Sequence, residues 1–244
     1  MADIRTFDAP DELTTAAADL VLDAARAAVR DRGRFSWCLS GGSTPAMLYR
    51  KLASEPYAAR MPWDRTFVFW GDERWVPPDH PDSNARMARE ELLSSVPVPP
   101  ENVRSIVTAG VEPEASAAAA EEHVRTLLGP GLRPDLVLLG LGEDGHTASL
   151  FPGTAALGER TLLFAANHVP SLDAWRITAT LPLLNAARHI AFLVVGSSKA
   201  RALRQVLYPG AETMVLPASM VRPADGKLTW LLDREAAALL PHAG

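Results

Sequence analysis

Four short apolar segments do not show the polar and apolar alternation of a half-buried strand. They cover residues 35–39 (FSWCL), 67–70 (FVFW), 136–139 (LVLL) and 190–195 (IAFLVV). Apolar runs of this length are typical of strands buried on both faces, as in a parallel sheet covered by helices. We therefore expect these segments to form the centre of such a sheet.

The segments between the apolar runs carry the three-to-four-residue spacing of amphipathic helices. Residues 11–30 place Leu13, Ala17 and Val21 on one face, and Gly33 follows as a stop signal. Further helices are expected at residues 45–53, 83–93, 113–128 and 197–207. Strands alternating with helices predict an α/β fold that is doubly wound and Rossmann-like, with a mostly parallel sheet and helices on both faces. We expect residues 1–244 to form one such domain.

Polar residues follow each apolar run. The loops read SGGSTP from Ser40, GDER from Gly71, GLGEDGHT from Gly140 and GSSK from Gly196. Ligands of parallel α/β sheets bind in loops at the carboxyl ends of the strands. We therefore expect the four loops to converge on one site.

The composition narrows the class of ligand. The 244 residues are 48% hydrophobic and 22% charged, which allows a large core and argues against general disorder. The net charge of −5 argues against nucleic acid as the main partner, because binding its backbone needs a basic surface. A small anionic substrate remains compatible, since a few local cations can bind it.

The single cysteine, Cys38, lies in an apolar run, so no disulfide can form within the chain and no Cys-x-x-Cys metal pair exists. The first residues lack the basic and apolar segments of a signal peptide, and no stretch approaches the ~20 apolar residues of a membrane span. We expect a cytoplasmic monomer that contacts neither membrane nor nucleic acid.

The SGGSTP loop (residues 40–45) is a candidate anion cradle. Its glycines let successive N–H groups point to one place, with Thr44 as N-cap and Pro45 at the first helical position. A phosphate is favoured at such a helix start. The alternative is a simple tight turn, and the GK[ST] ending of a P-loop is missing. The candidate ligands are Gly41, Gly42, Ser43 and Thr44.

Cations in the other loops could add to this cradle. Arg74 could hold a phosphate and Asp72 is a further candidate for binding substrate, although a salt-bridged surface turn is the alternative. Nothing nearby completes a metal ligand set around Asp72. Lys199 begins a helix and Arg176 precedes a further candidate strand, so both could bring positive charge to the site.

The GLGEDG sequence formally matches a dinucleotide fingerprint, but two acidic residues would face the pyrophosphate and Pro152 soon ends the helix. His146 is a stronger functional signal than the GLGEDG match, because a histidine beside a strand end can take a proton near neutral pH. Asp144 could orient its ring, and Gly145 could contact substrate. The alternative is a histidine that only caps a helix.

The remaining histidines occupy polar or terminal contexts and are expected at the surface. They are His80, His123, His168, His189 and His242. No GxSxG elbow is present and Cys38 is expected inside a strand, so covalent catalysis has no evident nucleophile. A phosphate cradle with cations and a basic histidine suggests hydrolysis or isomerisation of a sugar phosphate.

Taken together, these motifs resemble the 6-phosphogluconolactonase family, within the group that includes glucosamine-6-phosphate deaminase. The matching stretches are LSGGSTPAMLY, FVFWGDERWVPPDHPDSNARMARE, PDLVLLGLGEDGHTASLFPG, RITATLPLLNAARHIAFLVVGSSKA and LPASMVRPADGKLTWLLDREAA. They run in order from about residue 39 to the end, with residues 97–132 and 158–175 matched loosely. Deaminases continue the glycine-rich loop as GHIAFNEP, whereas GHTASLFPG and GDERWVP resemble the lactonases.

The resemblance implies hydrolysis of 6-phospho-D-glucono-1,5-lactone to 6-phosphogluconate in the oxidative pentose phosphate pathway, without metal or cofactor. His146, oriented by Asp144, would activate water. The alternatives are a deaminase or isomerase of amino sugar phosphates and a non-catalytic sugar-phosphate sensor. A sensor would not need His146. A nicotinamide oxidoreductase is a more distant possibility.

Overall fold

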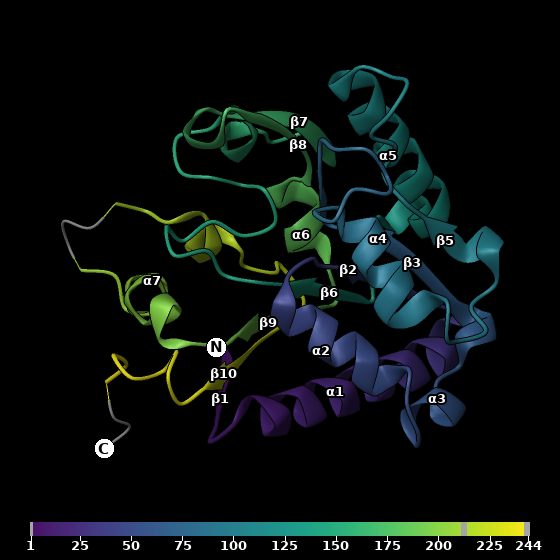
Figure 1. The fold of residues 1–244 in the computed structure, drawn as a ribbon, viewed down its shortest axis with the longest axis horizontal. Helices are drawn as coiled ribbons and strands as arrows, with labels where there is room; N and C mark the ends of the chain where they lie inside the picture. Colours follow the sequence, from purple (N-terminus) through teal and green to yellow (C-terminus); the bar gives the residue numbers. More distant parts are fainter. Residues whose placement is uncertain (1, 211–213, 242–244) are drawn as a thin grey trace.

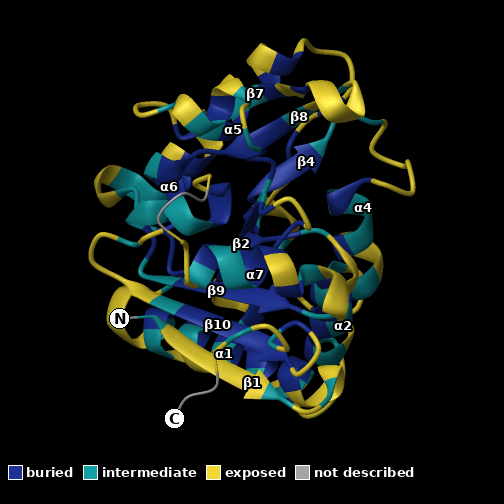
Figure 2. Ribbon diagram, turned by 90° about the vertical axis from the view of Figure 1, so that its left-hand side faces the viewer, coloured by how far each residue is buried: buried dark blue, intermediate teal, exposed yellow. Residues whose placement is uncertain are grey.

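The computed structural model describes residues 2–210 and 214–241, and its centre is a seven-stranded parallel sheet (Figure 1). In spatial order its strands are β1 (Asp3–Phe7), β10 (Lys227–Asp233), β9 (His189–Val194), β6 (Leu136–Leu139), β2 (Phe35–Leu39), β3 (Thr66–Trp70) and β5 (Val103–Arg104). The four segments predicted from sequence are the central neighbours β9, β6, β2 and β3, and they are largely buried (Figure 2). The predicted parallel sheet is confirmed.

The helices also follow the sequence pattern. They are α1 (Pro10–Arg32), α2 (Ser43–Leu52), α3 (Tyr57–Arg60), α4 (Asn84–Ala88), α5 (Pro113–Leu128), α6 (Leu181–Ala186) and α7 (Ala200–Leu207). Helix α1 stops where predicted, because Gly33 adopts φ 73° and its N–H donates to the Val29 carbonyl at 2.8 Å. A π-helical turn (Arg89–Leu93) continues α4. Within the described residues, no helix combines the length and apolar character needed to cross a membrane.

The order of the strands creates a crevice beside β2. From β2 the chain moves outward to β3 and β5, then returns to place β6, β9 and β10 on the other side of β2. The loops that follow the carboxyl ends of β2 and β6 therefore run in opposite directions. Ligands of open α/β sheets bind at such a switch point. Here it lies between the SGGSTP and GLGEDGH loops.

A second, antiparallel sheet covers one side of this crevice, and the sequence did not predict it. It consists of β4 (Asp72–Arg74), β8 (Ala174–Ala179) and β7 (Phe164–Val169). The GDER segment is therefore mostly strand rather than loop, because β4 pairs with β8 about a hundred residues later. Arg176 lies within β8 instead of preceding it. Local sequence patterns carry no information about such a distant partner.

Most of the assigned surface histidines are exposed, with one exception. His189 begins β9 and is half-buried, with its Nε2 2.9 Å from the Thr229 hydroxyl. Burial lowers the pKa of His189 to about 4, so the side chain is neutral at pH 7. The surface assignment of His189 was wrong because a polar residue at a strand end can still be covered by the next strand. His242 lies outside the described residues.

Candidate active site

A cavity of about 630 Å³ opens at the carboxyl ends of the central strands, and all four predicted loops contribute to its wall. The predicted residues that line it are Gly41, Gly42, Ser43, Thr44, Asp72, Arg74, Asp144, His146, Arg176 and Lys199. The structure thus brings together residues as far apart in sequence as Gly41 and Lys199. Their individual roles stay predictions.

Gly145 is the exception among the predicted site residues, since it is buried and is not part of the cavity wall. Its φ of 80° lies in the left-handed region that favours glycine. A Cβ atom at this position would lie 2.6 Å from a side-chain carbon of Leu216. Gly145 therefore sets the shape of the loop behind the cavity wall, and its contact with substrate stays a prediction.

Helix α2 begins two residues earlier than predicted, at Ser43 instead of Pro45. Its N-cap is Gly42, with φ 104°, rather than Thr44, which lies in the first turn and makes no capping hydrogen bond. Glycine fits here because an L-residue rarely adopts this φ. The first N–H groups of a helix lack intrahelical partners. Ser43 and Thr44 therefore bring free N–H groups and hydroxyls to the cavity wall, which suits an anion.

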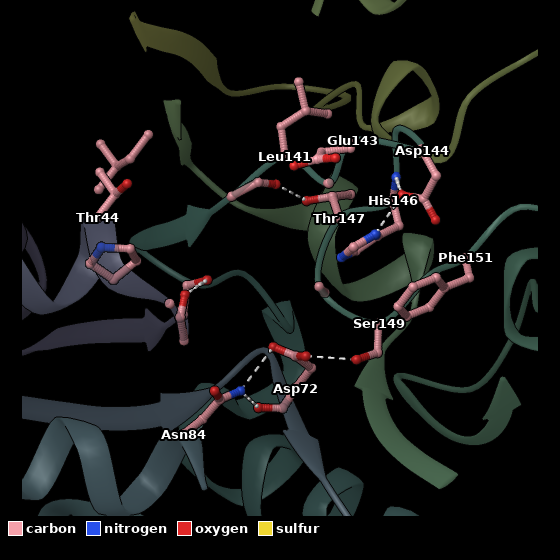
Figure 3. Close-up of a pocket in the computed structure, with 18 of the residues that line it drawn as sticks. Thr44, Asp72, Asn84, Leu141, Glu143, Asp144, His146, Thr147, Ser149 and Phe151 are labelled. Carbon is pink, nitrogen blue, oxygen red and sulfur yellow. Dashed lines mark hydrogen bonds and ion pairs between the residues drawn. The ribbon is translucent and has the colours of Figure 1, made fainter. Parts of the chain in front are cut away.

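His146 is held from two sides (Figure 3). Its Nδ1 lies 2.6 Å from Oδ1 of Asp144, which also accepts the backbone N–H of His146 at 3.0 Å. The Phe151 ring stacks on the imidazole with 4.1 Å between centroids and 22° between planes. With Nδ1–H donating to the carboxylate, Nε2 carries the lone pair. The side chain is 31% exposed, so this lone pair is accessible to water.

In the loop that carries His146, the backbone at Gly142 lies close to the imidazole and is hydrogen-bonded within the loop. The Gly142 N–H donates to the His146 carbonyl at 2.8 Å, and the Gly145 N–H donates to the Gly142 carbonyl at 3.0 Å. A Cβ at Gly142 would lie only 2.0 Å from Nδ1 of His146. Glycine at position 142 therefore makes room for the imidazole.

Asp72 is a buried carboxylate at the cavity wall, fixed by two residues that sequence reasoning missed (Figure 3). The Ser149 hydroxyl donates to its Oδ2 at 2.6 Å, and Nδ2 of Asn84 donates to its backbone carbonyl at 2.9 Å. Asn84 and Ser149 also line the cavity. Both lie in stretches that carry the family resemblance, DSNARMARE and GHTASLFPG, and that was the available signal.

Glu73 has a different task from its neighbour, because successive strand residues point to opposite faces. Its carboxylate accepts the backbone N–H groups of Asn84 at 2.7 Å and Ala85 at 2.8 Å, at the start of α4. Burial raises the pKa of Glu73, while these hydrogen bonds oppose the shift. Glu73 therefore anchors α4 outside the cavity. Within the described part of the chain, no group of three His, Cys, Asp or Glu side chains is arranged to hold a metal ion.

Three cations face the cavity. Arg74 and Arg176 are directly opposite each other across the β4–β8 pair. Burial lowers the pKa of Arg176, and the charge of Arg74 lowers it further. Lys199 enters from the start of α7, with its Nζ 3.7 Å from Oε1 of Glu143. Two neighbouring guanidinium groups repel each other, so an anion between them would relieve that repulsion.

Comparisons with known proteins agree with this geometry. A family model described as glucosamine-6-phosphate isomerases/6-phosphogluconolactonase matches residues 8–230. A 6-phosphogluconolactonase of Nostoc sp. is 45% identical over 226 residues, which is 91% of each chain. One from Synechocystis sp. is 44% identical over 213 residues, 86% of each chain. The solved 6-phosphogluconolactonase of Trypanosoma cruzi is 32% identical, with a TM-score of 0.88, and the match covers 98% of this chain and 97% of that one.

Proposed function

The chain belongs to the family of glucosamine-6-phosphate isomerases and 6-phosphogluconolactonases, and we propose that it is an enzyme that hydrolyses 6-phospho-D-glucono-1,5-lactone to 6-phosphogluconate in the pentose phosphate pathway. One observation carries the proposal. An imidazole held by a carboxylate at 2.6 Å shares a cavity with three cations and a helix N-terminus. That combination suits a phosphorylated ester that reacts with water.

In the proposed mechanism, Nε2 of His146 takes a proton from water while the oxygen of that water attacks the C1 carbonyl of the lactone. Asp144 stabilises the imidazolium that forms. When the tetrahedral intermediate collapses, the bond between C1 and the ring oxygen breaks and His146 returns its proton to that oxygen. The product is the open-chain acid, and the histidine is again neutral.

The cations and backbone donors supply the remaining stabilisation. We propose that Arg74, Arg176, Lys199 and the N–H groups at the start of α2 divide two tasks, holding the phosphate and stabilising the oxyanion. A positioned base contributes roughly 10²- to 10⁴-fold in rate. One oxyanion donor contributes on the order of 10²- to 10³-fold. Since a lactone is already an activated ester, these effects are sufficient.

The direct test is a pH-stat assay on freshly prepared 6-phosphogluconolactone, corrected for spontaneous opening. His146→Ala is expected to lose roughly 10²- to 10⁴-fold in kcat while its melting temperature stays near that of the wild type. His123→Ala is the matched control, because His123 is exposed on α5 and does not line the cavity. Near-normal turnover of His146→Ala would remove this residue from the role of base.

A pair of substrates separates the two tasks of the cations. Glucono-1,5-lactone lacks the phosphate but forms the same oxyanion. A variant of a phosphate ligand, such as Lys199→Met or Arg74→Met, should lose activity only on the phosphorylated lactone. A variant of an oxyanion donor should lose kcat on both. Equal activity of all variants on both lactones would contradict the assignment of these cations to the site.

The deaminase alternative makes a different chemical prediction. It requires ammonia release from glucosamine 6-phosphate, whereas the lactonase releases acid from the lactone. The high identity to proteins named 6-phosphogluconolactonase favours the lactonase. Ammonia release comparable to the rate of lactone opening would reverse this choice.

We further propose that the enzyme is a single-domain monomer that works in the cytoplasm without a metal ion or an organic cofactor. The only cysteine, Cys38, is buried in β2 and takes part in no disulfide, which suits a reducing compartment. The catalytic steps above need only protein groups and water. Dialysis against EDTA should leave kcat unchanged, and a loss that zinc or magnesium restores would contradict the proposal.

A further inference from the structure

A second cavity, of about 510 Å³, lies at the amino ends of the parallel strands, beside the end of α1. Its charged lining residues are Arg32, Arg34, Arg65, Arg133, Arg188, Asp64, Glu101 and Asp135. Five arginines thus face three carboxylates in a chain whose net charge is −5. Positive charge is concentrated here against the overall balance of the protein.

Structural contacts account for two of these arginines. Nε of Arg32 donates to Oδ1 of the buried Asp135 at 2.8 Å. The other oxygen of Asp135 accepts the backbone N–H of Ser36 at 2.8 Å and its hydroxyl at 2.7 Å. Arg133 donates to the Ala186 carbonyl at 3.1 Å and to Asp225. These contacts tie the strand ends together and leave Asp135 fully engaged.

The other three arginines make weaker contacts or none. Arg34, Arg65 and Arg188 each stand directly before a strand, at the starts of β2, β3 and β9. Nε of Arg188 is buried and makes no hydrogen bond, and its contact with Oδ1 of Asp135 is a long ion pair of 3.6 Å. Within residues 2–210 and 214–241, Arg34 has no side-chain hydrogen bond or ion pair. Arg65 contacts only its exposed neighbour Asp64, at 3.4 Å.

We propose that this cavity is a second anion site, which binds a small phosphorylated anion through Arg34 and Arg188, with Arg65 at its rim. A guanidinium presents paired N–H donors that match the oxygens of a phosphate. An anion here would bind the more accessible N–H groups of the Arg188 guanidinium and would reduce the repulsion among the arginines. The recess between strand ends favours a compact ligand over an extended polymer. Phe67 and Leu128 add apolar wall.

The site is separate from the candidate active site, because the two cavities lie at opposite ends of the same strands and share no lining residue. An anion could therefore bind while substrate or product occupies the first cavity. The inference does not depend on the proposed lactonase activity; only the choice of 6-phosphogluconate to block the first cavity in the test rests on it.

The test is calorimetric titration of the full chain with pyrophosphate in the presence of saturating 6-phosphogluconate, which fills the first cavity. We expect one pyrophosphate per chain for the wild type and at least a tenfold weaker affinity for Arg34→Gln/Arg188→Gln. Arg34→Gln alone should also weaken binding, and it serves if the double variant does not fold. Arg30→Gln is the matched control, since this exposed arginine of α1 pairs only with Asp31.

Melting temperature and lactonase turnover are measured on every variant, so that loss of the fold and failure of the proposed activity are recognised separately. Absence of binding to the wild type would overturn the proposal. Equal affinity of folded Arg34→Gln, Arg34→Gln/Arg188→Gln and Arg30→Gln would overturn it as well, because the anion would then bind elsewhere.

Discussion

The substitution Gly142→Ala tests whether the position of the imidazole, rather than its mere presence, sets the rate. A Cβ at residue 142 would lie 2.0 Å from Nδ1 of His146, whereas ordinary van der Waals contact begins at 3.4 Å. The imidazole must therefore move by about 1.4 Å. The same methyl group would lie 2.7 Å from Oδ1 of Asp144, so the carboxylate cannot simply follow the ring.

The expected cost follows from this displacement. A misplacement of about 1 Å can lower a rate by roughly 10²-fold, which corresponds to about 2.7 kcal/mol in the activation free energy. Gly142 does not have a positive φ, so alanine is compatible with the backbone and the chain should still fold. The phosphate contacts come from other loops. We therefore expect kcat to fall by roughly 10²-fold while KM changes little.

The assay is the pH-stat measurement of lactone opening, combined with thermal melting. Gly158→Ala is the matched control, because a Cβ there meets no atom within 4 Å and the residue lies outside the cavity wall. A kcat of Gly142→Ala within threefold of the wild type would refute the reasoning. It would mean that catalysis does not require the observed placement of His146.

Three further predictions concern the aromatic neighbour of the imidazole, the half-buried histidine and the core. Phe151→Leu removes the ring stacked on His146, so kcat should fall by about 2- to 10-fold while KM stays unchanged. An unchanged kcat in the same assay would show that the stacked ring is dispensable. Because the folded-state pKa of His189, about 4, lies below its ordinary 6.5, the folded chain binds fewer protons than the unfolded chain between these values. The free energy of unfolding should therefore decrease by about 1–3 kcal/mol as pH falls from 6.5 to 4, and urea titrations of His189→Gln should lack this part of the decrease; its persistence would assign it to other groups. Trp230→Ala removes a fully buried ring that stacks on Phe192 at 3.8 Å and should lower the free energy of unfolding by about 3–5 kcal/mol in urea; a loss below about 1 kcal/mol would contradict the observed packing.

The convergence of the polar loops on one site was predictable because short, local sequence segments define both the strands and the loops. Each central strand is a brief apolar run, and each polar loop follows directly, so the parallel arrangement alone predicts where the loops meet. Helix α1 was predicted to its end because Gly33 is a local stop signal. The pairing of Asp144 with His146 also needed only a separation of two residues.

The start of α2 shows the limit of such local signals. Thr44 and Pro45 form a plausible cap and first turn in the sequence, yet the helix begins at Ser43 after Gly42. Several start positions lie within one or two residues of each other, and the packing of the loop against its neighbours selects one. Asn84 was missed because its place in the cavity wall depends on a hydrogen bond to Asp72, twelve residues earlier, which no local pattern records.

By itself, the sequence determined the parallel sheet, its covering helices and the set of polar loops at the strand ends, since these depend on interactions between near neighbours. Only the tertiary structure decided that β4 pairs with β8, which places Arg74 opposite Arg176. It alone also brought together arginines from three strand starts at the amino ends of the sheet strands. The physical reason is the same in both cases. The energy that selects these arrangements comes from contacts between residues tens to more than a hundred positions apart, and no local period records them.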